Sequence, residues 1–118
     1  TFGTMLETAH EISEKLSYRN ISVKIINARF IKPLDEKILH EVFKSNLPII
    51  TIEESCKIGG FGTSICEFAI KHKYKNDIEV FGIEDSFFHH GDTANLRKLS
   101  NLDCESIINK IQSLISIC

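Results

Sequence analysis

Several features are scarce in this sequence of 118 residues. It contains no tryptophan, one methionine and two prolines. It has no basic tract and its formal net charge is −2, so we expect no nucleic-acid partner, because such partners are held by clustered lysine and arginine. Its apolar runs are far shorter than the roughly 20 residues that a membrane-spanning helix needs, so we expect no membrane partner.

The four cysteines form no recognisable metal-binding or disulfide motif. Cys56, Cys66, Cys104 and Cys118 include no C-x-x-C pair, and their spacing matches neither a zinc site nor a disulfide framework. We therefore expect reduced thiols, as in a reducing compartment. The length fits a single domain, residues 1–118, which is large enough to bury a core without a metal or a disulfide.

Helical and strand periodicities alternate along the chain. Apolar residues at helical spacing predict helices over about 4–18, 33–46, 63–74 and 103–115, with a short helix at 93–99, whereas β-branched or apolar runs predict strands at 21–30, 47–52 and 78–83. This alternation predicts an α/β fold with three layers (αβα) and a mostly parallel sheet.

The start of the chain is abrupt. Thr1, Phe2 and Gly3 are typical of the end of a strand, so we expect a truncated first strand and a fragment of a larger enzyme. Thr4 and Glu7 then form a T-x-x-E pattern, which predicts a capping box at the start of the first helix.

The segment after the second predicted strand is the most distinctive. It passes from Glu53 and Glu54 into the turn Gly59-Gly60-Phe61-Gly62 and then into a helix. Such a junction can present backbone N–H groups to an anion. The lysine of a P-loop and the third glycine of a dinucleotide fingerprint are absent, so we favour a structural turn or a contact with another domain, with anion binding as the alternative.

The charged residues near this turn leave alternatives open. Adjacent strand residues point to opposite faces, so at most one of Glu53 and Glu54 can face a given site. The interpretation that we favour pairs one glutamate with a lysine or arginine, or with helix N–H groups. Arg29, at the end of the first predicted strand, could bind either glutamate or a group on another domain.

A loop at residues 84–92 carries aromatic and histidine side chains. Vicinal histidines such as His89 and His90 rarely bind one ion, so we expect no metal site there. Phe87 is expected to be a core or interface anchor, and His90 is expected to precede a turn at Gly91. The sequence contains no G-x-S-x-G elbow and no recognisable catalytic triad.

Three motifs together resemble one enzyme family. They are N-A-R-F-I-K-P-L-D at 27–35, T-I-E-E followed by G-G-F-G at 51–62, and D-S-F-F-H-H-G at 85–91. In this order they are similar to the C-terminal, third domain of the 1-deoxy-D-xylulose-5-phosphate synthase family, which is transketolase-like. Asn27 and Phe88 depart from the family pattern, which has Asp and an aliphatic residue there. The middle motif is shared loosely by other transketolase-like enzymes, such as pyruvate dehydrogenase beta subunits, which are the alternative.

The resemblance implies a transferase as the full-length protein. It would condense pyruvate with glyceraldehyde 3-phosphate, release carbon dioxide, and serve isoprenoid biosynthesis by the non-mevalonate pathway as well as thiamine biosynthesis. It would use thiamine diphosphate and Mg²⁺, both bound by other domains, with no catalytic, cofactor-binding or metal residue in this one. The implied compartment is the bacterial cytoplasm or a plastid-type organelle, of which we prefer the organelle.

The role implied for this domain is architectural, and the fragment alone is expected to be inactive. It would pack against other domains of the same polypeptide and help to form a homodimer. Our candidate interdomain or interface residues are Arg29, Glu53, Glu54, Gly59, Gly60, Phe61, Gly62, Phe87, His90 and Gly91.

Overall fold

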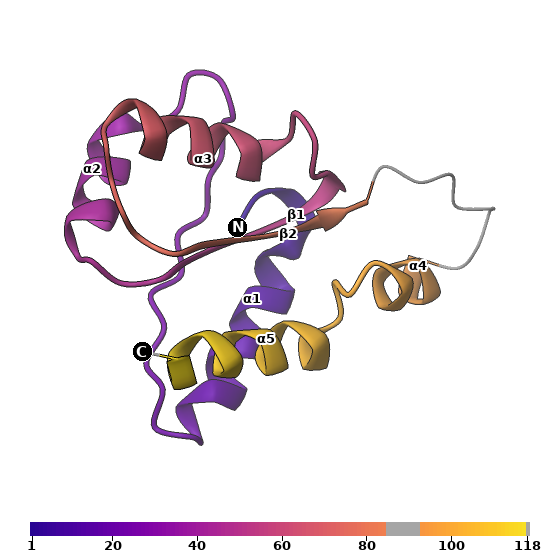
Figure 1. The fold of residues 1–118 in the computed structure, drawn as a ribbon. Coiled ribbons are helices and arrows are strands. Elements are labelled where there is room, and N and C mark those ends of the chain that lie inside the picture. Colours follow the sequence, from indigo (N-terminus) through magenta and orange to yellow (C-terminus); the bar gives the residue numbers. More distant parts are fainter. Residues whose placement is uncertain (85–92, 118) are drawn as a thin grey trace.

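The computed structural model describes residues 1–84 and 93–117 (Figure 1). Its elements are η1 (Gly3–Met5), α1 (Leu6–Ser17), α2 (Glu36–Lys44), β1 (Ile49–Cys56), α3 (Phe61–Lys71), β2 (Ile78–Ile83), α4 (Thr93–Leu99) and α5 (Cys104–Ile117). All five predicted helices and two of the three predicted strands are present. The predictions for Phe87, His90 and Gly91 lie outside the described residues.

The sheet is built around two parallel strands. β1 pairs with β2 in a continuous register from Ile49 opposite Ile78 to Ile52 opposite Phe81. The register then becomes irregular before Cys56 pairs with Ile83. Runs of isoleucine favour this arrangement, because β-branched side chains pack well on a pleated surface that is covered on both faces.

The strand predicted at 21–30 is not a regular strand. Its described pairing with the N-terminal residues is one parallel bridge between Ala28 and Phe2, together with a hydrogen bond from the amino group of Thr1 to the carbonyl of Ile26 (2.7 Å). The N–H of Ala28 donates to the carbonyl of Thr1 (2.8 Å), and the N–H of Phe2 donates to the carbonyl of Ile52 in β1 (3.1 Å). Thr1 and Phe2 thus lie between this segment and β1. A regular strand needs backbone hydrogen-bond partners along its whole length. Thr1 and Phe2 supply such partners to only a few residues of the segment, so no regular strand forms.

The two faces of the sheet carry separate apolar cores. On one face, η1, α1 and α5 cover the sheet, and on the other face lie α2 and α3, as Figure 1 shows. The first core is Met5, Ile12, Leu16, Ile52, Phe81, Leu102, Ile107, Ile108 and Ile111, and the second is Phe43, Phe61, Ile65, Phe68 and Ala69. The arrangement confirms the predicted three-layer α/β class, because each amphipathic helix buries one apolar stripe against the strands.

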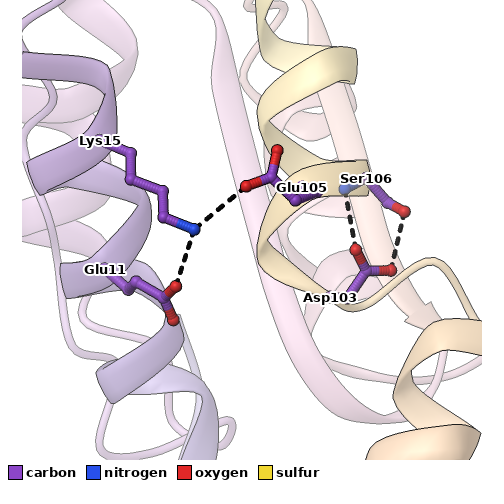
Figure 2. Close-up of polar contacts among 5 residues, drawn as sticks. All are labelled: Glu11, Lys15, Asp103, Glu105 and Ser106. Atoms are coloured by element: carbon purple, nitrogen blue, oxygen red, sulfur yellow. Dashed lines mark hydrogen bonds and ion pairs between the residues drawn. The ribbon is translucent and has the colours of Figure 1, made fainter. Parts of the chain in front are cut away.

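Polar contacts at the surface join α1 to α5 (Figure 2). Nζ of Lys15 lies 2.9 Å from a carboxylate oxygen of Glu11 on the same helix and 3.1 Å from one of Glu105 on α5. Asp103 caps α5 as predicted, since its carboxylate accepts the N–H of Ser106 at 3.1 Å and the hydroxyl of the same residue at 2.7 Å. This satisfies a donor that the first helical turn leaves free.

Two predicted helix starts need correction. The capping box of the first helix does not form, because the Thr4 hydroxyl donates to the carboxylate of Glu54 instead. A short 3₁₀ turn therefore precedes α1, which has no side-chain cap. The second helix begins at Glu36 rather than at Pro33, since the side chain of Asp35 accepts the N–H of Ile38 (3.1 Å) and so fixes the first turn.

Candidate functional site

The carboxylate of Glu53 caps the N-terminus of α3. Glu53 is fully buried on the sheet face that α3 covers. Its Oε2 accepts the backbone N–H of Phe61 (2.8 Å), and its Oε1 accepts the backbone N–H of Gly62 (2.7 Å). The hydroxyl of Ser55 donates to the same carboxylate. A buried negative charge is thereby placed against the positive end of a helix dipole, which is one of the two interpretations that the sequence favoured for a glutamate here.

The glycines of the turn allow this close approach. A Cβ on Gly60 would lie 2.3 Å from the carbonyl oxygen of Cys56 and 2.5 Å from Oε2 of Glu53. A Cβ on Gly62 would lie 2.3 Å from a methyl carbon of Val80 in β2. Gly59 instead adopts a left-handed φ of +73°, which disfavours any residue with a side chain. Gly60 and Gly62 are therefore required by packing inside the chain.

Glu54 points to the opposite face and binds different partners. One oxygen accepts a hydrogen bond from Nε of Arg97 in α4 (2.8 Å), and the other accepts the hydroxyl of Thr4. Both hydrogen bonds hold the pKa of the Glu54 carboxyl below its ordinary value of 4.5, and the bond from Arg97 has the larger effect. The hydrogen bond to Glu54 also raises the pKa of Arg97. The predicted division of the two glutamates between opposite faces is confirmed.

Arg29 does not join this arrangement. Its side chain is exposed, and among the residues in the described ranges it forms no ion pair with either glutamate. Glu53 is held instead by helix N–H groups, and Glu54 by Arg97. Phe61, by contrast, is buried in the core between α2 and α3.

The arrangement positions secondary-structure elements, because Glu53 binds the start of α3 and Glu54 binds Arg97 of α4. Among the described residues, Cys56, Cys66 and Cys104 carry free thiols. Burial raises the pKa of the thiols of Cys66 and Cys104, which lowers their nucleophilic thiolate fraction.

Several side chains of the structure were not predicted from the sequence. For Arg97, an arginine on a short helix next to a predicted sheet edge was a weak signal, and for Ser55 there was none. Glu36, His40 and His72 form a further cluster, of which only the i, i+4 spacing of Glu36 and His40 on a predicted helix could have been recognised. His72 joins them only through tertiary packing.

In the part of the chain that the structure describes, no helix is both long and apolar enough to cross a membrane. The chain is 46% identical over 116 residues to a protein named 1-deoxy-D-xylulose-5-phosphate synthase from Bacillus mycoides (strain KBAB4), and 48% identical over 116 residues to one of the same name from Geobacillus sp. (strain WCH70). Each alignment covers 98% of this chain and 18% of the relative, so the chain spans under a fifth of those proteins.

A solved structure shares the fold. The structure titled "Split gene transketolase, inactive beta4 tetramer" matches with a TM-score of 0.85 and 23% sequence identity, over 95% of this chain and 36% of that chain. The family profile described as "Transketolase, C-terminal domain" matches residues 1–107. That match covers most of the chain in the order of elements described above, and the chain therefore belongs to the transketolase C-terminal domain family.

Proposed function

We propose that this chain is the C-terminal domain of a thiamine-diphosphate-dependent transferase that makes 1-deoxy-D-xylulose 5-phosphate from pyruvate and glyceraldehyde 3-phosphate, with loss of carbon dioxide. The observation that carries the proposal is identity of 44–48% over 98% of the chain to proteins named for that synthase. Their names favour the synthase over the pyruvate dehydrogenase alternative. The place of the product in isoprenoid and thiamine biosynthesis belongs to the same proposal.

The glycine turn before α3 does not fit the diphosphate of thiamine diphosphate. The N-terminus of α3 is where a glycine turn would receive a diphosphate, but the N–H groups of Phe61 and Gly62 already donate to Glu53. A second anion would meet the buried Glu53 carboxylate at close range, which costs free energy. This observation disfavours the anion-binding module. It agrees with a protein in which other domains bind the cofactor and Mg²⁺.

The proposed role of the domain is to pack against a neighbouring domain and to support a homodimer. Most of the candidate interface residues that the structure describes have contacts inside the chain, namely Glu53, Glu54, Gly60, Phe61 and Gly62. The surface part of the turn is Ile58 and Gly59, and Ile58 is 73% exposed. Phe30, beside the exposed Arg29, is 70% exposed. Ile58 and Phe30 adjoin the candidate interface residues Gly59 and Arg29 in the sequence, so they are the apolar side chains that the proposed contact would cover.

The compartment follows from the same proposal. The relatives compared above come from bacteria, and they favour the bacterial alternative. They lend no support to the plastid-type organelle that we preferred from the sequence.

The reaction can be tested with the full-length polypeptide that carries this chain. Release of carbon dioxide from labelled pyruvate should require both glyceraldehyde 3-phosphate and thiamine diphosphate. Decarboxylation that needs a different acceptor would favour the pyruvate dehydrogenase alternative, and no decarboxylation under any of these conditions would contradict the proposal.

The architectural role needs a variant that leaves the fold of the domain intact. Ile58→Ser is suited to this because the side chain is exposed, whereas a bulky residue at Gly60 would strike Cys56 and Glu53. In the full-length protein, Ile58→Ser should lower the dimer fraction in light scattering and lower activity in parallel. The matched control is Tyr18→Ser, at a side chain 79% exposed at the end of α1. Equal behaviour of the two variants would contradict a role for the turn.

A further inference from the structure

Three potential metal ligands meet where α2 packs beside α3. Glu36 and His40 are four residues apart on α2, so their side chains share one face of the helix. His72 caps the C-terminal end of α3. Helices α2 and α3 lie on the same side of the sheet (Figure 1). One ligand atom of each residue lies within 4.8 Å of those of the other two.

The imidazole of His72 has an unused nitrogen. Its Nε2 is buried and has no hydrogen-bond partner among the described residues. Buried polar side-chain atoms nearly always have a partner, so an orphan of this kind requires an explanation. A metal ion that accepts the lone pair of a neutral imidazole supplies one.

The imidazole of His40 is oriented by a hydrogen bond. Its Nδ1 lies 2.7 Å from the hydroxyl oxygen of Tyr74. If the proton is on Nδ1, this nitrogen donates to the hydroxyl and Nε2 keeps its lone pair for a metal. Histidine ligands usually have such a bond from the second ring nitrogen, which fixes the tautomer and the ring orientation.

Aromatic packing holds both rings together. The ring centroids of His40 and His72 are 4.6 Å apart in an edge-on arrangement. Phe68 packs against both, at 5.0 Å from His40 and 4.4 Å from His72. Aromatic packing thus fixes two of the three ligands, which lowers the entropic cost of binding an ion.

We propose that Glu36, His40 and His72 bind a divalent transition-metal ion, for which Zn²⁺ is the best match. Two imidazole nitrogens and a carboxylate oxygen suit zinc, whereas Mg²⁺ and Ca²⁺ require mostly oxygen ligands. Three protein ligands leave the fourth tetrahedral position to water or to another group. The ion would tie the first turn of α2 to the end of α3.

Binding requires a small inward movement of the ligands. With metal–ligand bonds of about 2.0–2.1 Å, tetrahedral ligand atoms are about 3.3 Å apart. Glu36 is exposed, and its described ion pair, with Nζ of Lys71, has a separation of 4.0 Å. Exposed pairs of this kind are weak, so the carboxylate is free to turn toward the histidines.

The test is a calorimetric titration in which Zn²⁺ is added to the full-length protein that carries this chain. Excess Mg²⁺ is present to fill sites for hard cations. We expect Glu36→Gln and His40→Asn each to weaken zinc binding at this site by at least about 10-fold. The matched control is His10→Asn, an exposed histidine on α1, which should leave the affinity unchanged. Because Glu36 is exposed, Glu36→Gln keeps the test valid if His40→Asn fails to fold.

A Co²⁺ titration identifies the ligands. We expect visible d–d bands that weaken in Glu36→Gln and His40→Asn, without the near-ultraviolet charge-transfer band of a thiolate ligand. Wild-type zinc affinity in both variants would overturn the proposal, and so would a thiolate band that persists in them. The proposed synthase activity is measured separately, so failure of this site would leave that assay unaffected.

Discussion

Oε1 of Glu53 accepts a 2.7 Å hydrogen bond from the backbone N–H of Gly62, nine residues further along the chain. The bond links the end of β1 to the first turn of α3 and places a buried charge where the helix dipole is positive. It also explains why the turn is rich in glycine, since a side chain at position 60 would collide with this carboxylate. The glycine turn is thus organised around an anion that the chain itself supplies.

We predict that Glu53→Ala strongly destabilises the chain. Removing the carboxylate leaves the buried N–H groups of Phe61 and Gly62 without partners, which should lower the free energy of unfolding by about 3 kcal/mol. Glu53→Gln keeps one acceptor oxygen and should cost less. Urea unfolding followed by circular dichroism measures both.

The control for this prediction is Glu67→Ala, at an exposed glutamate on α3. It should change the free energy of unfolding by less than about 0.5 kcal/mol. A loss for Glu53→Ala as small as that for Glu67→Ala would show that the bonds to the helix N-terminus contribute little.

We predict that Gly62→Ala destabilises the chain through collisions with Val80, which is the nearer, and with Oγ1 of Thr51. The added Cβ would lie 2.3 Å and 3.0 Å from the two methyl carbons of Val80, and overpacking of this kind costs about 1–3 kcal/mol. Val80→Ala removes both methyl groups. The double variant should therefore be more stable than the sum of the two single changes predicts, as measured in a double-mutant cycle by urea unfolding. Simple additivity would place the strain elsewhere, for instance at Thr51.

We predict a pH-dependent contribution from Glu54. The hydrogen bond from Arg97, together with that from Thr4, holds the pKa of this carboxyl below 4.5 in the folded state. The stabilisation is therefore fully present above about pH 4.5, and it is lost as the pH falls through the lower pKa of the folded state. Glu54→Gln should reduce the free energy of unfolding by up to about 1 kcal/mol at pH 7, and the difference should shrink below pH 4.5.

Arg97→Met tests the origin of that pH dependence. In this background the effect of Glu54→Gln should be smaller, and its change with pH should be weaker, because the main cause of the low pKa is gone. Thermal or urea unfolding between pH 3 and 7 provides the comparison. An unchanged pH profile would mean that Arg97 does not stabilise the charged carboxylate.

We predict that the cap of α5 depends on the acceptor atoms of Asp103. The carboxylate accepts two hydrogen bonds from Ser106, at 3.1 and 2.7 Å (Figure 2). Asp103→Ala should lower the free energy of unfolding by about 1 kcal/mol, whereas Asp103→Asn, which keeps an acceptor, should cost much less. Urea unfolding separates the two variants. Equal losses would indicate that the charge, rather than the cap geometry, is what matters.

Much of the fold could be predicted from the sequence because its signals are local. The helical periodicity over residues 4–18 and the isoleucine run that forms β1 depend only on nearby residues. The cap at Asp103 is equally local, since Asp103 and Ser106 are three residues apart. The predicted capping box of Thr4 failed because Glu54, 50 residues away, competes for the same hydroxyl. A local capping pattern does not form when a residue far away in the sequence binds the same group.

The alternation of helices and strands in the sequence determined the α/β class, and adjacency alone determined that Glu53 and Glu54 face opposite ways. Only the tertiary structure decided their partners. Glu53 meets the N–H groups of α3, and Glu54 meets Arg97, because the β1–α3 turn and the packing of α4 bring these groups within hydrogen-bond distance. The tertiary structure likewise places His72 beside Glu36 and His40. Hydrogen bonds and metal coordination act over a few ångströms, so positions in space, rather than separations in sequence, select the partners.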